Sequence, residues 1–374
     1  MAIRELYIDR LRVALTALVI FHHTAITYGA SGSWFYNELR PSSAPSSLVL
    51  TLFAATNQAY FMGFFFLLAG YFTPPSLERK GYVRYLGDRL LRLGLPLLFF
   101  ILVLGPATAG LATWAQGDGF WPTILWLWQH QRIINGPLWF AQALLLFALA
   151  YCGGRAIFGA KLEASARTER AVPSGFRWLL AALGVGVAAW AIRLGIPVGK
   201  NLFGLQLGYF ASYIFLFVLG TAAWRHDWLR QLTARHARPW IAVMILALLS
   251  LPVALMLGDT HRGAGSSGFE GGLRWQAAFY ALWEPFIAWG AIALLLLLFR
   301  RYGNRPSRLG DWLGRRAYAA YMLHAPVLVA VALALHGWSA PALAKFATTG
   351  LLACAITWLV ADPLVRLPGL RRVL

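Results

Sequence analysis

The chain has 374 residues, of which 59% are hydrophobic and only 13% charged, and its formal net charge is +19 at pH 7. Together with a mean hydropathy of +0.60, this composition excludes a soluble globular protein and indicates a polytopic membrane protein. The positive charge alone would suit a nucleic-acid partner. It is concentrated in short loops between hydrophobic segments, however, so we expect a lipid bilayer and no nucleic acid as the partner.

Ten hydrophobic segments predict an all-α transmembrane helix bundle. They lie at 11–29, 48–73, 93–113, 137–152, 178–193, 205–224, 239–258, 275–299, 317–336 and 343–361. The loops are too short for another folded domain, so we expect one integral-membrane domain over residues 1–374 and no separate soluble domain. Counted loop by loop, 26 of the 33 lysines and arginines fall on the side of the N-terminus. The positive-inside rule then predicts that both termini are cytoplasmic and that the protein is multi-pass in the cytoplasmic membrane.

Two connecting segments and the end of the last helix carry further expectations. Residues 74–92 are expected to form an arginine-rich inward loop. Residues 114–136 contain three tryptophans beside polar residues, which is typical of a helix lying at the headgroup level. Asp362 and Pro363 are expected to end the last helix.

The first hydrophobic segment carries ionisable residues, which are costly inside a bilayer and often functional. Arg12 and His23 are eleven residues apart, close to three helical turns, so both lie on one helix face and are separated by roughly 16 Å at ~1.5 Å per residue. A neutral imidazole is suited to removing a proton near pH 7, whereas His22 points about 100° away. The competing interpretations are a hydrogen-bonded packing histidine and an arginine that only anchors the helix beside Asp9.

Two further arginines, Arg89 and Arg92, stand three residues apart immediately before the third segment. They are explained either as positive charges of an inward-facing loop or as a phosphate clamp. The clamp is chemically suitable because a guanidinium binds phosphate through two parallel N–H groups. With Arg12, they are the candidate site for an anionic cofactor.

Polar residues deep in later segments complete the set of candidates. Glu284 is the only carboxylate deep in a span, so it must be protonated, paired or beside water. His324 shares a helix face with Tyr321. The eight histidines and two cysteines form no metal-binding motif, so we expect no metal. The sequence also lacks a nucleophile elbow and a phosphate-binding loop.

Several segments together resemble the membrane acyltransferase 3 family, in order and over nearly the whole chain. The segments are RELYIDRLRVALTALVIFHH, in which Arg12 and His23 match the family's arginine–histidine spacing, FFFLLAGYF (64–72), DRLLRLGLPL, GPLWFAQALL, AYAAYMLHAPVL and ADPLVR. Glucan-modifying members look most similar in length and in the opening segment. The chain departs from the pattern at Ala69, where serine is common, and at Asp362, where glutamate is usual.

The resemblance implies an O-acyltransferase that moves an acyl group from cytoplasmic acyl-CoA to a hydroxyl of a glycan, lipid or other extracytoplasmic acceptor. His23 would be the general base or a transient acyl carrier, and Glu284 or His324 would orient it. The arginines Arg12, Arg89 and Arg92 would bind the phosphates of acyl-CoA. The sequence does not distinguish an acetyl from a succinyl group. The alternative class is a transporter or flippase of a small polar solute or glycan, which also suits polar residues at mid-depth in ten helices.

Overall fold

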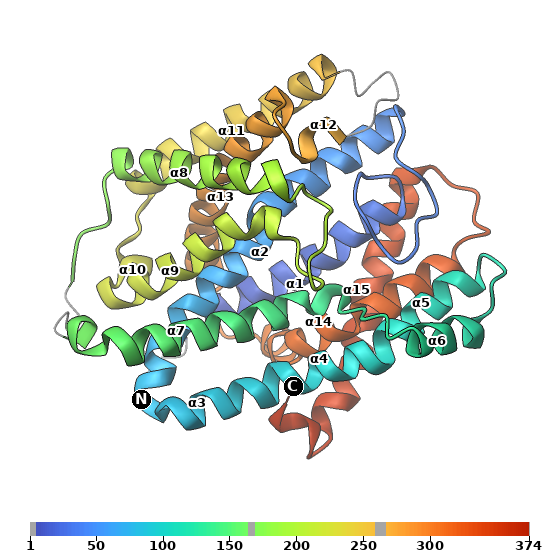
Figure 1. Cartoon of the computed structure of the whole chain (residues 1–374), viewed down its shortest axis with the longest axis horizontal. Helices are drawn as coiled ribbons and strands as arrows, with labels where there is room; N and C mark the ends of the chain where they lie inside the picture. Colours follow the sequence, from blue (N-terminus) through green and yellow to red (C-terminus); the bar gives the residue numbers. More distant parts are fainter. Residues whose placement is uncertain (1–4, 164–168, 259–266, 374) are drawn as a thin grey trace. The chain divides into compact units, whose positions relative to one another are not determined.

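The computed structural model describes residues 5–163, 169–258 and 267–373, and within these ranges the chain is helical, with two isolated β-bridges in place of strands. Figure 1 shows the helices and their labels. Their bounds are α1 Leu6–Thr27, α2 Pro45–Lys80, α3 Tyr82–Arg89, α4 Leu95–Phe99, α5 Gly105–Trp114, α6 Phe120–Gln129, α7 Trp139–Glu163, α8 Gly175–Gly195, α9 Phe210–His226, α10 Trp228–Gln231, α11 Ala234–Leu257, α12 Ser267–Glu270, α13 Trp275–Tyr302, α14 Arg308–Ala334 and α15 Ala342–Arg366. Short π-helical segments, η1 (Leu90–Gly94) and η2 (Phe100–Leu104), join α3 to α4 and α4 to α5, and short 3-10 turns are η3 (Gly136–Leu138), η4 (Leu207–Tyr209) and η6 (Leu370–Arg372).

Nine helices within the described ranges are long and apolar enough to cross a membrane, and they correspond to the second to tenth predicted segments. The first segment is α1, whose 22 residues span about 33 Å at ~1.5 Å per residue and therefore suffice for a bilayer. It falls outside the nine because Arg12, His22 and His23 lower its mean hydropathy. The all-α, multi-pass architecture is thus as predicted.

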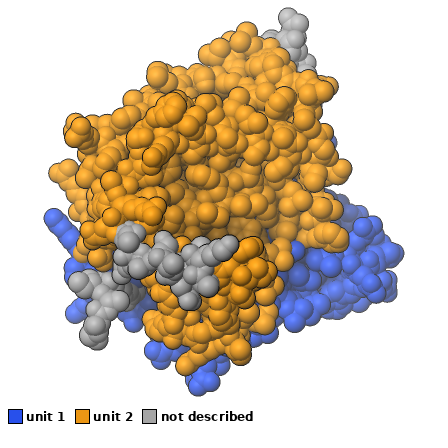
Figure 2. Space-filling view, turned by 60° about the vertical axis from the view of Figure 1, so that its left-hand side comes forward, with its two compact units in different colours: residues 1–57, 91–142, 305–374 blue, residues 58–90, 143–304 orange. Residues whose placement is uncertain are grey.

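The chain forms two compact units, coloured separately in Figure 2. Unit 1 contains residues 1–57, 91–142 and 305–374, and unit 2 contains residues 58–90 and 143–304. In unit 1, α14 packs against α1, α15 and α5. An ion pair of 2.7 Å between Arg10 and Asp311 fastens the first turns of α1 and α14 to each other.

Residues 82–114 form one long helical segment that two prolines interrupt. A proline ring in a helix clashes with the carbonyl four residues earlier and removes its hydrogen bond, and η1 and η2 lie just before Pro96 and Pro106. The two freed carbonyls, of Arg92 and Leu102, accept hydrogen bonds from side chains of unit 1 instead. The Tyr318 hydroxyl donates to the first at 2.8 Å and the Trp128 indole to the second at 3.1 Å. Side chains thus compensate both breaks, as an apolar surrounding requires.

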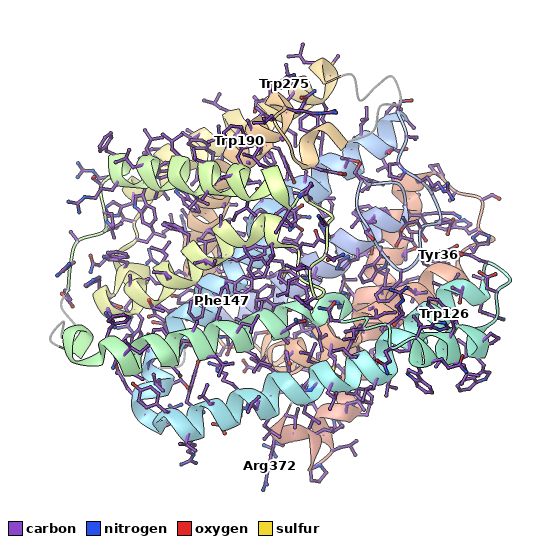
Figure 3. The ribbon with its side chains drawn as sticks, viewed as in Figure 1. Tyr36, Trp126, Phe147, Trp190, Trp275 and Arg372 are labelled. Carbon is purple, nitrogen blue, oxygen red and sulfur yellow. The ribbon has the colours of Figure 1, made fainter. Side chains whose placement is uncertain are left out.

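In unit 2, α13 packs against α8 and α11, and α8 packs against α9, as Figure 1 also shows. The second part of α2 crosses α9 with backbones in close approach. A Cβ atom at Gly70 would overlap the backbone of Phe217, and one at Gly220 would overlap the backbone of Leu67. Only glycine fits these two positions. Beside this crossing, the ring of Phe147 (labelled in Figure 3) packs edge-to-face against Phe210 and Phe217 and at a tilt against Phe66.

The expectation of a loop between the second and third hydrophobic segments is wrong. Residues 74–92 are not a loop, because α2 continues to Lys80 and α3 begins at Tyr82. The sharp turn between them uses Gly81 at a φ of +73°, and the Lys80 ammonium lies 2.5 Å from the Asp88 carboxylate across the turn.

Asp362 does not end the last helix either. Helix α15 continues to Arg366, and the Asp362 carboxylate accepts hydrogen bonds from Arg316 and Trp312 of α14. It therefore joins α14 to α15. The expected helix in residues 114–136 is present as α6, whose Trp121, Trp126 and Trp128 are exposed.

Candidate active site

Three aromatic rings lie parallel to one another in unit 1 and make up the candidate site. The His23 imidazole of α1 stacks on the Trp34 indole with ring centres 3.7 Å apart and planes inclined by 16°. The His324 imidazole of α14 lies 5.4 Å from His23 and 5.9 Å from Trp34, at 15° and 10°. The packing of α1 against α14 thus brings together two candidate residues that are three hundred positions apart in the sequence.

The protonation pattern of His324 follows from its hydrogen bond. Its Nδ1 lies 2.6 Å from the backbone carbonyl oxygen of Tyr321, and because a carbonyl only accepts, Nδ1 carries the proton. In a neutral imidazole, Nε2 then holds an unshared electron pair and is the proton-accepting atom. The side chain is fully buried at 0% exposure, so this lone pair has a fixed direction.

The stack has unused hydrogen-bonding capacity. Nε2 of His324, Nδ1 of His23 and Nε1 of Trp34 are buried and have no hydrogen-bond partner among the residues that the structure describes. Burying a polar atom without a partner costs free energy, and such atoms in native proteins call for an explanation. One donor, the indole N–H, and one fixed acceptor, the His324 lone pair, complement a hydroxyl group, which both accepts and donates.

Trp34 comes from the loop that follows α1, and polar contacts fasten this loop to α15 and to the end of α14. The carboxylate of Glu38, with 6% of its side chain exposed, accepts a hydrogen bond from the Lys345 ammonium. The Tyr36 hydroxyl, labelled in Figure 3, lies 3.0 Å from Nδ1 of His336. Burial and the nearby Glu38 carboxylate raise the pKa of Tyr36, so its hydroxyl stays protonated at neutral pH. These contacts hold the indole in place over His23.

Glu284, the third candidate catalytic residue, has a partner in unit 2 that the sequence analysis did not identify. Its Oε2 lies 2.5 Å from Nη2 of Arg193, and Nε of Arg193 donates to the Gly208 carbonyl at 3.0 Å. The guanidinium is 0% exposed, with the rings of Tyr209 and Tyr280 5.2 and 5.4 Å away. Glu284 is therefore paired, one of the three states that the sequence allowed.

A signal for Arg193 was present in the sequence. It is the last residue of the predicted segment 178–193, and the loop-by-loop count of lysines and arginines assigns it to the loop that follows. The structure instead places it inside α8, two residues before the helix ends at Gly195.

The three candidate phosphate-binding arginines have different surroundings. Arg12 lies on α1 with 41% of its side chain exposed, and its guanidinium is 3.6 Å from the Asp9 carboxylate. Arg89 ends α3, and its guanidinium carbon is 5.0 Å from the centre of the Tyr85 ring. Arg92 is exposed within η1. The π-helical turn between Arg89 and Arg92 widens the helix, and such turns are frequent at functional sites.

Comparison with known proteins identifies the family. The family model described as "Acyltransferase domain", of the acyltransferase 3 type, matches residues 5–362. Among curated proteins, the chain is similar to "Glucans biosynthesis protein C" of Salmonella heidelberg (strain SL476) and of Salmonella schwarzengrund (strain CVM19633). Each is 28% identical over 246 residues, or 63% of this chain and 62% of the relative. The match thus spans less than two thirds of these relatives' length.

No solved structure shows significant similarity to the chain. The family match, in contrast, runs from the start of α1 into α15 and includes all three rings of the stack. The protein is a multi-pass membrane protein, and it belongs to the acyltransferase 3 family of membrane acyltransferases.

Proposed function

We propose that this protein transfers an acyl group from cytoplasmic acyl-CoA to a hydroxyl group of an extracytoplasmic glycan, with His23 as the general base. The single observation that carries the proposal is the stack of His23, Trp34 and His324, whose unpartnered donor and acceptor match a hydroxyl. The name of the curated relatives, glucans biosynthesis protein C, supports a glucan as the acceptor.

The proposed reaction needs one proton transfer in each direction. The imidazole of His23 takes the proton of the acceptor hydroxyl while the oxygen attacks the thioester carbonyl carbon. The C–S bond of the resulting tetrahedral intermediate breaks, the ester forms, and the proton passes to the sulfur of the departing CoA. The Trp34 N–H would donate to the oxygen of this hydroxyl and hold it against His23. Because the hydroxyl has a single proton, the His324 lone pair would accept from a neighbouring hydroxyl of the glycan. Positioning of this kind is a large part of enzymatic rate enhancement.

The donor would bind at the arginine-rich side of the helices. Arg12 and His23 lie on one continuous helix, with the arginine roughly 16 Å below the imidazole at ~1.5 Å per residue. The phosphates of acyl-CoA would bind to Arg12, Arg89 and Arg92. The pantetheine arm could then extend along the helix to His23. This assignment places both termini in the cytoplasm. The family match includes residues of both units, which supports treating the chain as one catalytic domain.

A matched pair of adjacent variants tests the proposal. Purified protein in lipid nanodiscs is incubated with acetyl-CoA or succinyl-CoA and a soluble glucan, and both CoA release and glucan ester are measured. His23→Ala should lower transfer by about 10²–10⁴-fold. His22→Ala, the neighbour on another helix face, should keep much of the activity.

The outcomes discriminate between the alternatives. Wild-type rates for His23→Ala would refute the general-base role. Uptake of the glucan into vesicles without any CoA release would refute the acyltransferase and favour a transporter. Mass spectrometry of protein incubated with acyl-CoA alone distinguishes direct transfer from an acyl-enzyme, because only the latter adds the mass of one acyl group.

A further inference from the structure

Unit 2 contains an apolar pocket that the proposed reaction does not use. It is an open cavity of about 100 Å³ between α2, α8, α9, α10, α11 and α13. The ring systems of four tryptophans line it, together with leucine, isoleucine and alanine side chains. The tryptophans are Trp178, Trp228, Trp240 and Trp289.

Two indole N–H groups of this lining are already engaged within the protein. The indole N–H of Trp289 donates to the Trp178 carbonyl at 3.1 Å, and that of Trp228 donates to the Arg170 carbonyl at 2.9 Å. These two tryptophans therefore offer the pocket hydrocarbon surface only. A ligand with polar groups along its length would lose hydrogen bonds to water without replacement, so the interior favours a hydrocarbon chain.

Fixed positive charge stands at the edge of the same pocket. The Arg300 guanidinium donates to the carbonyls of Leu229 and Arg230 at 2.9 and 3.0 Å, and also to that of Leu232. Leu229 and Leu232 line the pocket, so these three bonds hold a cation at the turn between α10 and α11.

Further arginines alternate with the lining residues along the chain. Arg235 directly precedes the lining residue His236 and is exposed. Arg177 precedes the lining residue Trp178 and is also exposed. Acidic residues in this region include Asp227, which lies 3.8 Å from Arg230, and Glu169, which precedes Arg170. Arginines outnumber these two carboxylates around the lining residues, so the rim of the pocket carries a net positive charge.

We infer that this pocket binds one acyl chain of an anionic phospholipid, with the phosphate headgroup on the arginine rim. An apolar interior beside a cluster of arginines at a helix-bundle surface matches the two parts of such a lipid. Basic residues near a membrane surface attract anionic headgroups, and the charge pattern of the loops predicts that this rim faces the cytoplasmic leaflet. The inference concerns unit 2 alone and is independent of the proposed transfer reaction.

Native mass spectrometry of delipidated protein tests the inference. The probes are phosphatidylglycerol and phosphatidylcholine with identical long chains, and phosphatidylglycerol with short chains. The wild type should bind long-chain phosphatidylglycerol most tightly. The double variant Arg177→Gln/Arg235→Gln should lose about fivefold in affinity per arginine, equivalent to ~1 kcal/mol each. Arg371→Gln/Arg372→Gln, which removes two exposed arginines from η6, is the matched control and should bind as the wild type does.

A second variant tests the chain site. Ala293 lines the pocket, so Ala293→Phe should abolish the preference for long chains, whereas Ala188→Phe on an exposed position of α8 should not. The rim variant changes only exposed side chains, so it stays folded even where Ala293→Phe does not. Equal binding of phosphatidylglycerol and phosphatidylcholine, or an unchanged affinity of the rim variant, would overturn the inference. Displacement of phosphatidylglycerol by lower concentrations of long-chain acyl-CoA would also overturn it, because the pocket would then belong to the acyl donor.

Discussion

The buried ion pair between Arg193 and Glu284 gives a prediction whose size follows from the structure. Both side chains are almost fully buried, at 0% and 6% exposure, so removal of one partner leaves the other in an apolar surrounding. Breaking such a pair costs about 3–5 kcal/mol. The two directions are unequal, because an unpaired carboxyl can take up a proton, whereas a guanidinium cannot give one up.

Glu284→Leu should therefore destabilise the protein by about 3–5 kcal/mol. Arg193→Leu should cost less, because Glu284 can become neutral. The double variant should recover most of the loss, since replacing a buried pair by apolar side chains is often neutral or stabilising. Arg230→Leu, which breaks the largely exposed pair with Asp227, is the control and should cost about 0–1 kcal/mol.

The assay is thermal unfolding in detergent, followed for the single variants, the double variant and the control. A loss of 3–5 kcal/mol lowers the melting temperature by about 4–6 °C in a chain of this size. The reasoning is refuted if the costs of the two single variants simply add in the double variant. Acyl transfer by the double variant then decides the role of the pair: a stable but inactive protein shows that transfer requires the pair, and an active one makes the pair structural.

Three further predictions concern the arginines, the loop after α1 and the topology. Arg92→Glu should raise the concentration of acyl-CoA needed for half-maximal rate. Arg92→Lys should be partly tolerated, because it keeps the positive charge but loses the two parallel N–H groups of the guanidinium. The same effect from Arg84→Glu would show that only the overall positive charge matters and not the position of Arg92. Trp34→Phe should raise the acceptor KM about 2–12-fold, since it removes one hydrogen bond, and Trp34→Ala should raise it further; unchanged acceptor kinetics would contradict the role of the indole. A reporter that works only in the cytoplasm should be active when it is fused after Leu374. Activity of a reporter that works only in the periplasm would contradict the predicted topology.

The parts of the fold that follow helical periodicity could be predicted from the sequence. His23 and His324 were both singled out, because an imidazole within a hydrophobic segment stands out against its neighbours. Their proximity follows from the packing of α1 against α14, which no local pattern specifies. Trp34 was not a candidate site residue, since it lies in a loop where an aromatic residue reads as an interfacial anchor.

The limits of the helices were harder to predict than their existence. Pro96 and Pro106 lie inside one helical segment because π-helical turns and side-chain donors compensate for them. Those donors, Tyr318 and Trp128, are distant in the sequence. The buried position of Arg193 could not be predicted for a related reason. Its partner Glu284 lies 91 positions away in the sequence, and a guanidinium is stable in an apolar surrounding only when such a partner is present.

The spacing of the aromatic stack has a consequence for how an acceptor reaches His23. Ring centres 3.7 Å apart are in van der Waals contact, so no atom fits between His23 and Trp34. An acceptor hydroxyl must therefore approach the edge of the imidazole or displace the indole. The loop that carries Trp34 is held by the contact between Glu38 and Lys345. Under the proposed mechanism, the strength of that contact would set how readily the indole leaves. The loop that would position the acceptor would then also control access to His23.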